Sequence, residues 1–238
     1  MPLPPFALDE VAVVLRGHFN PAIFSPAWLL AEGLISKTAY AEAELRVISS
    51  EIAIFETGWL KCNITRDLLQ ISTSEESDFE RVRDVAVGIL RALPQTPVGA
   101  LGINREMHFL VQSLDQWHRI GDTLAPKEVW ESVLKLPGMR GVNIWGVRPD
   151  NFAGRIQVDV QPSLRVSLGI YIRHNDHYGL SVVDAQPTTR AKIFPGDEQL
   201  EASIEKNPLA VKILIDNFET SMRSSRLVTE RIAKLAEG

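Results

Sequence analysis

Alternating apolar and polar positions predict strands in the first half of the chain. Residues 11–15 are all apolar and mostly β-branched, which is typical of a strand with both faces covered. Within residues 52–73, Leu60, Cys62 and Ile64 alternate with polar neighbours, and a polar turn leads into a return strand. The first half is therefore predicted to contain a buried strand and an antiparallel hairpin.

The second half shows the same alternation in a series of segments. Residues 98–112 form an extended stretch that contains Gly99 and Gly102, and glycines in a strand indicate a bulge or a close approach to the backbone. Three or four further strands are predicted, at 141–147, 155–161, 165–173 and 179–183. In the second of these, strict alternation favours an antiparallel sheet with one exposed face.

Helical spacing of apolar residues, together with capping residues, predicts five helices. Ser25 and Pro26 supply the N-cap and the first-turn proline of the first helix, and Pro94 ends the third. The predicted helices cover residues 27–32, 38–47, 79–93, 126–134 and 207–236. The apolar stripe of the last helix includes Ile215, so Ile215→Asp is predicted to unfold the protein.

Runs of strands separated by single helices, without regular alternation, predict the α+β class. The expected architecture is a largely antiparallel sheet, or sheets, from two strand-rich halves, with short helices and a long C-terminal helix. We expect residues 1–8 to form an extended arm and residues 9–238 to form a single domain. Residues 9–115 and 116–206 are similar in content and are candidate halves of that domain, followed by the helix at 207–236.

Composition narrows the classes of partner. The 238 residues are 45% apolar and carry a net charge of -5, an acidic balance that argues against binding to nucleic acid. The basic residues of the last helix do not change this expectation, because acidic residues are interleaved with them. The basic set is Lys212, Arg223, Arg226, Arg231 and Lys234, and the acidic set is Asp216, Glu219, Glu230 and Glu237.

Hydropathy argues against export and membrane insertion. Residues 1–6 carry neither a positive segment nor a long apolar one, as a signal peptide would. The longest apolar stretches fall far short of the roughly 18 residues needed to cross a bilayer. We therefore expect a cytoplasmic protein without membrane association.

The polar cluster at residues 173–177 is the most suggestive candidate site. In an extended segment His174 and Asp176 would share one face, and a metal would need a third ligand such as His18 or His108. The favoured interpretation is a polar hairpin turn, because imidazoles at this spacing point apart and Asn and Asp suit turns. No metal site is therefore predicted.

Two further candidate positions lie beside glycine or proline. Asn104, Arg105 and His108 accompany the glycine-containing strand, where Arg105 could hold a carboxylate or phosphate or could simply pair with an acidic neighbour. Asn20, before a proline, could face a ligand or make a local turn. The ligand-binding candidates are Asn20, Asn104, Arg105, His108, His174 and Asp176.

Reaction motifs are missing from the sequence. It contains no nucleophile elbow, no phosphate-binding loop, no dinucleotide fingerprint and no His-Glu-x-x-His pair, so we predict no catalytic residue and no cofactor. The leading interpretation is a non-catalytic interaction or scaffold protein that binds protein partners. The alternative is a small-ligand-binding protein or enzyme with a pocket between the sheet and the C-terminal helix.

Two short segments resemble an uncharacterised, sporadically distributed family of bacterial proteins. They are GHFNPAIFSPAW at residues 17–28 and VGALGINR at residues 98–105, and the long helix at the end of the chain is also similar. The resemblance implies a bacterial protein from a mobile or defence-related locus. It supplies no activity and no site residue.

The last helix also suggests an assembly. Nearly thirty residues span about 45 Å, which is longer than the strands beneath the helix can cover. The thinner apolar stripe of residues 222–235 then needs a second surface, and a two-fold homodimer is the commonest source of one. Packing on residues 27–47 of the same chain is the alternative.

Overall fold

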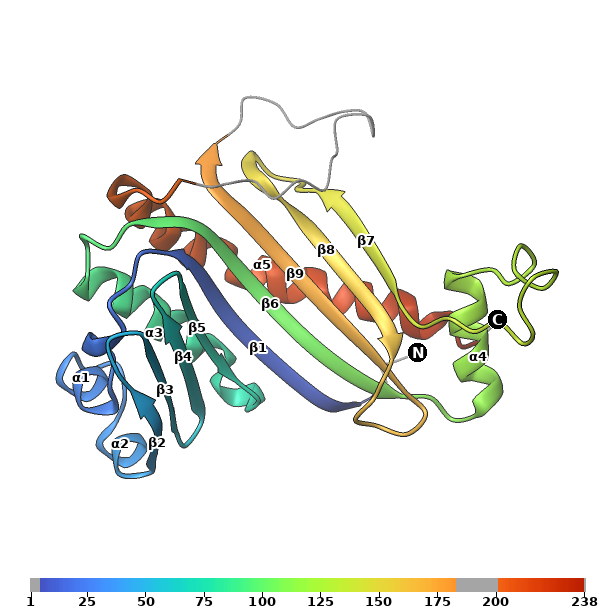
Figure 1. Ribbon diagram of the computed structural model, residues 1–238, viewed down its shortest axis with the longest axis horizontal. Helices are drawn as coiled ribbons and strands as arrows, with labels where there is room; N and C mark the ends of the chain where they lie inside the picture. The colour runs from blue at the N-terminus through green and yellow to red at the C-terminus, as the bar shows by residue number, and fades with distance from the viewer. Residues whose placement is uncertain (1–4, 183–200, 238) are drawn as a thin grey trace.

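The computed structural model describes residues 5–182 and 201–237 of the chain. It is an α+β protein with one nine-stranded antiparallel sheet in the order β2-β3-β4-β5-β1-β6-β9-β8-β7 (Figure 1). The strands are β1 (Phe6–Gly17), β2 (Ala43–Ile48), β3 (Ile52–Thr57), β4 (Leu60–Thr65), β5 (Leu68–Thr73), β6 (Val98–Leu110), β7 (Val142–Val147), β8 (Phe152–Pro162) and β9 (Gly169–Val182). The predicted fold class is confirmed, and the two candidate halves contribute to a single sheet.

The helices are distributed unevenly around the sheet. They are α1 (Pro26–Ala31), α2 (Lys37–Ala41), α3 (Phe79–Ala92), α4 (Leu114–Leu124) and α5 (Asn207–Lys234). In Figure 1, α3 and α5 lie behind the sheet, α1 and α2 lie near β2 and β3, and α4 lies at the opposite end. We call the face under α3 and α5 the helix side and the other face the outer side. No helix in the described ranges is long and apolar enough to cross a membrane.

A first apolar cluster fills the helix side around β1, β3, β4, β5 and α3. Alternate residues of β1, namely Val11, Val13 and Leu15, are fully buried because they point toward α3. The first half of α5 adds Ile213 and Phe218 to the same cluster. This part of the molecule is a continuous apolar core, as the apolar run at 11–15 and the alternation at 60–64 predict. The prediction that both faces of residues 11–15 are covered is too strong, because Val14 on the outer side is only half-buried.

A second apolar cluster lies under β6, β8 and β9. Its buried members include Met107, Phe109, Ile120 and Ile172. The second half of α5 packs against them through Val228, Ile232 and Leu235. The apolar stripe at 222–235 therefore packs on the sheet of its own chain rather than on residues 27–47. The need for a second surface, which was the reason to expect a dimer through this helix, is removed.

Several local predictions are confirmed. Leu60, Cys62 and Ile64 are buried in β4, which pairs with β3 and β5. The first helix begins after Ser25, whose Oγ accepts a hydrogen bond from the Trp28 amide at 3.1 Å. The long C-terminal helix begins at Asn207, as predicted.

Two predictions near the start of the chain are wrong. The helix expected at residues 38–47 ends at Ala41, and residues 43–48 form the edge strand β2. Pairing with β3 here outweighs the helix preference of the Ala- and Glu-rich segment. The expected arm at residues 1–8 is shorter, because Phe6 already belongs to β1 and pairs with Phe109.

Two predictions in the second half also need correction. Residues 126–134 form hydrogen-bonded turns, such as Leu134 N–H to the Trp130 carbonyl, and the helix lies earlier at Leu114–Leu124, capped by Ser113. The strands expected at 165–173 and 179–183 are one strand, β9, so the hairpin turn at 173–177 does not exist. Most of the irregular segment expected at 185–206 lies outside the described residues.

The role predicted for Ile215 is wrong as well. This side chain is 49% exposed, whereas its neighbours Ile213 and Leu214 are fully buried. The buried stripe of α5 continues through Phe218 and Ser221. Ile215 therefore lies beside the stripe, so Ile215→Asp is no longer expected to unfold the protein.

Candidate functional site

Buried polar side chains separate the two apolar clusters on the helix side. We call Asp9, Arg105, Arg148, His174 and Asp176 the polar belt. Arg105, Arg148, His174 and Asp176 are each at most 5% exposed. Cross-strand register explains how they meet, because Arg105 on β6 lies directly opposite His174 on β9. Buried charges of this kind persist only where they are paired, so the contacts of the belt decide its role.

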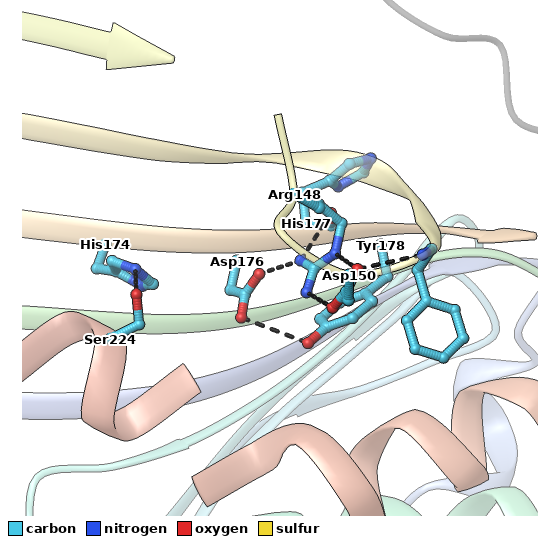
Figure 2. Close-up of polar contacts among 8 residues, drawn as sticks. Arg148, Asp150, His174, Asp176, His177, Tyr178 and Ser224 are labelled. Carbon is cyan, nitrogen blue, oxygen red and sulfur yellow. Dashed lines mark hydrogen bonds and ion pairs between the residues drawn. The ribbon is translucent and has the colours of Figure 1, made fainter. Parts of the chain in front are cut away.

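One end of the belt is an ion-pair network around Arg148 (Figure 2). The Arg148 guanidinium donates to both carboxylate oxygens of Asp150, at 3.0 and 2.7 Å, and contacts the Asp176 carboxylate. It also stacks over the Tyr178 ring, 3.4 Å from the centroid. The Tyr178 hydroxyl completes the group by donating to Asp176 at 3.4 Å. Every charge in this network has an opposite charge or a hydrogen bond beside it.

The pKa values within the network follow from burial and from these contacts. Burial alone would lower the pKa of Arg148, but hydrogen bonds to Asp150 and the charge of Asp176 raise it overall. Burial and the Asp176 charge raise the pKa of Tyr178. Burial lowers the pKa of His174, against the opposing effect of Asp176. These directions favour the charged form of Arg148 and the uncharged forms of Tyr178 and of the neighbouring His174.

The contact between His174 and Ser224 resembles the histidine–serine pair of a catalytic triad. The His174 Nε2 atom lies 3.2 Å from the Ser224 hydroxyl oxygen, but its Nδ1 atom has no hydrogen-bond partner among the described residues. Asp176, which would have to orient the imidazole, is occupied by Arg148 and Tyr178. His174 is also fully buried, so no substrate can reach it. The geometry favours a packing role for His174.

The other end of the belt fixes β1 to α5. The Arg105 guanidinium donates to the two carboxylate oxygens of Asp9, at 2.9 and 2.6 Å. Its remaining nitrogen donates to the Ser225 hydroxyl at 3.2 Å and to the Met222 carbonyl at 3.4 Å. A bidentate pair of this geometry is strongly directional. Arg105 therefore connects three elements, β1, β6 and α5, at the point where the first apolar cluster ends.

Next to this connection, one side of β1 has no neighbouring strand. β1 pairs with β6 from Phe6 to Gly17 but with β5 only over residues 11–16. No strand in the described part of the chain pairs with the far side of residues 6–10, and Figure 1 shows β1 continuing past the end of β5. We call this side of residues 6–10 the open edge. Outward-pointing N–H and C=O groups there are available to a binding partner.

A groove follows the open edge. Its larger pocket has a volume of about 540 Å³ and is lined by residues 5–10 together with Ser74, Glu76, Glu106, His108, Arg165 and Arg226. A second pocket of about 390 Å³ lies between α3 and α5 and includes Arg105 and Phe79. Glu76 and Arg226 line both pockets, so we treat the two as one groove. Each volume lies within the usual range for binding sites.

Charges of both signs line the groove. On the outer side Glu10 lies directly opposite Glu106, and Glu10 also accepts a hydrogen bond from Ser72 at 2.8 Å. Like charges opposite one another on a sheet are unfavourable. Glu106 is offset by Arg173, which lies directly opposite it on β9, whereas the cation paired with Glu10 in the described part of the chain is the Lys61 amine, at 3.7 Å. A cationic group beside Glu10 would relieve this repulsion.

The six residues predicted from the sequence do not form one site. Arg105, His174 and Asp176 belong to the polar belt, and His108 lines the groove, where its Nδ1 atom lies 2.8 Å from Ser163. Burial, assisted by the charge of Arg165, lowers the pKa of His108. The other two have local positions. Asn104 lies opposite Asn175 on the outer side, and Asn20 caps a short 3-10 turn by accepting from the Ala22 amide.

Metal-ligating side chains do not gather in the described ranges, which contain no group of three His, Cys, Asp or Glu residues suited to an ion. His174 and Asp176 do share one face, as their spacing predicts, but Asp176 is bound to Arg148 instead. The groove residues of β1 were not predicted from the sequence. Their only signal is that apolar and acidic residues continue the strand pattern back to Phe6, behind a proline-rich start.

Neither a model of a known protein family nor a curated protein sequence matches this chain.

Proposed function

We propose that this protein is a non-catalytic interaction protein that binds an extended peptide segment of a protein partner along the open edge of β1. The observation that carries the proposal is the coincidence of the open edge with the larger pocket, which is lined by residues 5–10. In this mode of recognition, main-chain hydrogen bonds supply affinity and pockets for alternate side chains supply specificity. The sheet and helices then act as the rigid support of the edge.

The polar belt supports the proposal by holding the edge in position. Asp9, in the middle of the open edge, is fixed by the bidentate contact with Arg105, which in turn binds Ser225 on α5. A strand segment that lacks one neighbour would otherwise be free to move away from the sheet. Pre-ordering of the edge lowers the entropic cost of binding a peptide.

The charges around the edge favour a peptide with a basic residue. A strand added beside residues 6–10 places alternate side chains on the outer side, where one of them lies opposite Glu10, while Glu106 lies on β6 at the other side of β1. Lysine or arginine at that position would pair with the Glu10 carboxylate and so reduce its repulsion with Glu106. On the helix side, the same peptide would meet Glu76 and Arg226, so charges of both signs can be accommodated there.

A displayed library of random peptides, selected on the immobilised protein, tests this proposal. We expect the selected peptides to be enriched in basic residues and to protect the amides of residues 6–10 from hydrogen exchange. Ala7→Trp should weaken their binding at least about tenfold, because Ala7 is exposed and lines the pocket. Ala27→Trp, at an exposed position of α1, is the matched control and should bind normally.

Two outcomes would overturn the proposal. Peptides that bind Ala7→Trp and the wild-type protein equally would lie elsewhere on the surface. A small molecule that protects the groove, while no peptide does so, would instead support the alternative of a small-ligand-binding protein with a pocket between the sheet and α5. A cytoplasmic location and a bacterial source stay predictions from the sequence.

A further inference from the structure

The outer edge of β2, at the end of the sheet, is a second unpaired strand edge. β2 pairs only with β3, and no residue of the described ranges covers its other side. Five of its six residues are exposed, and the apolar Leu45 is 63% exposed. Val47 and Ile48 on the same strand and Tyr40 on α2 are also exposed. An apolar edge strand left open in this way is prone to pair with another strand.

We propose that a second copy of this chain pairs with this edge, so that two β2 strands meet antiparallel around a two-fold axis and the two sheets become continuous. The proposal is independent of the peptide site, which lies on β1. It replaces the dimer through α5 that the sequence suggests, because the α5 stripe is already covered within the chain.

The charge pattern of β2 selects one arrangement of the pair. In an antiparallel pair, two residues that lie directly opposite each other have their side chains on the same side of the sheet. A two-fold axis between two copies of β2 must therefore lie midway between the two copies of one residue, which we call the axis residue. An axis at Glu44 would place two glutamates opposite each other, and an axis at Arg46 would do the same with two arginines. An axis at Leu45 instead places Glu44 opposite the partner's Arg46, twice over, with the two Leu45 side chains in contact.

Local contacts agree with that register. Glu44 lies directly opposite Glu56 on β3, and Arg46 reaches Glu56 at 2.8 Å, so both charged residues of β2 lie on the outer side of the sheet. Glu44 has no cationic neighbour within its own chain among the described ion pairs. The partner's Arg46 would supply one. Leu45, opposite the buried Phe55, lies on the helix side, where the second Leu45 would cover it.

A bulge in β2 limits the extent of the pair. The register to β3 shifts between Leu45 and Val47, so regular pairing is centred on residues 44–46. A contact of this length is small compared with stable interfaces, and the neighbouring Tyr40, Val47 and Ile48 must contribute to it. We therefore expect a concentration-dependent dimer that dissociates on dilution.

Sedimentation equilibrium on the full chain, from low to high micromolar concentration, tests the proposal. The wild-type protein should shift from the 26.5 kDa chain mass toward twice that value. Glu44→Arg and Arg46→Glu should each remain monomeric, because each places like charges opposite each other. Mixing these two variants should restore the dimer as a heterodimer, since every pair across the axis then joins opposite charges. The double variant Glu44→Arg/Arg46→Glu should dimerise by itself.

Melting curves confirm that each variant is folded before it is compared. A wild-type protein that stays monomeric over the whole range overturns the proposal. So does a dimer that persists in both single variants, or a mixture of them that fails to dimerise. Trp130→Glu is the control for a different exposed apolar segment and should leave the dimer unchanged, and a dimer lost only in that variant would contradict the assignment to β2.

Discussion

The helix-side faces of β1 and β9 have the same geometry but different contents. In β1 the inward positions Val11, Val13 and Leu15 are all apolar, whereas in β9 two inward isoleucines are followed by His174 and Asp176. Alternation places both sets in the interior equally well. The difference is that apolar side chains need only close packing, while the polar ones require partners: Arg148, which follows β7, for Asp176 and Ser224 on α5 for His174. The two strands thus show that burial and hydrophobicity are separate properties of a position.

The contrast also explains where the groove lies. The polar belt begins where the first apolar cluster ends, and its Asp9–Arg105 contact lies at the open edge of β1. Residues 11–16 have β5 on one side and β6 on the other, and the first apolar cluster packs against their inward side chains. Residues 6–10 have β6 as a neighbour on one side only, and the contact of Asp9 with Arg105 holds them in addition. The apolar clusters and the polar belt should therefore respond differently to substitution.

A charge placed in the apolar cluster should have the largest effect. Ile213→Asp should unfold the protein or leave it insoluble, because the side chain is fully buried among apolar neighbours. Ile215→Asp, two residues away and half exposed, should change the free energy of unfolding by less than about 0.5 kcal/mol. Urea denaturation of both variants measures the difference, and equal loss of stability would mean that the face of α5 is wrongly assigned.

Removal of one ion-pair partner from the polar belt should have the next largest effect on stability. Arg148→Met leaves the buried Asp176 without its cation and should cost about 3–5 kcal/mol of unfolding free energy. The double variant Arg148→Met/Asp176→Leu removes both buried charges and should recover much of that loss. A double-mutant cycle by denaturation gives the coupling energy. Additive effects would show that the two residues are not paired.

The second half of α5 should respond more mildly than the first. Ile232 is partly buried in the second apolar cluster, so Ile232→Glu should cost about 1–3 kcal/mol. Because this surface is covered within the chain, the substitution should leave the oligomeric mass unchanged. If Ile232→Glu abolished a dimer without lowering the free energy of unfolding, the result would support a dimer interface on α5.

The stability of the protein should depend on pH because His177 on β9 is largely buried. Burial, with the charges of Arg155 and Arg148, lowers the pKa of His177 to about 4, below its ordinary value of 6.5. Between these values the unfolded chain binds more protons than the folded one, so stability falls as the pH is lowered from 6.5 toward 4. Melting curves across that window should show a smaller decrease for His177→Gln than for the wild type. The same substitution at the exposed His118 is the control, and an equal decrease in all three proteins would contradict the assignment.

These contrasts also show what could be predicted from the sequence. The apolar pattern correctly located β1, the β4–β5 hairpin and the long helix α5, because most of the buried side chains there are apolar. It failed at residues 173–177, where polar residues resemble a turn but continue β9. Their partner Arg148 lies on a different segment, and no local pattern reveals such a contact.

The candidate site was predictable only in part. Arg105 and His108 were identified from their position beside glycine, and both line the groove. The open edge itself was missed, because it arises from the difference in length between β1 and β5. Pairing of strands that are distant in the sequence determines that difference, so a local pattern does not contain it.

Hydrogen exchange along β1 tests the peptide-binding account most directly. In the free protein, the outward-facing amides of residues 6–10 should exchange rapidly, while the amides of residues 11–16 are protected on both sides of the strand. Addition of a selected peptide at saturation should slow the outward-facing amides of residues 6–10 and leave residues 11–16 unchanged. Unchanged exchange at residues 6–10, with protection appearing elsewhere on the molecule, would contradict the account.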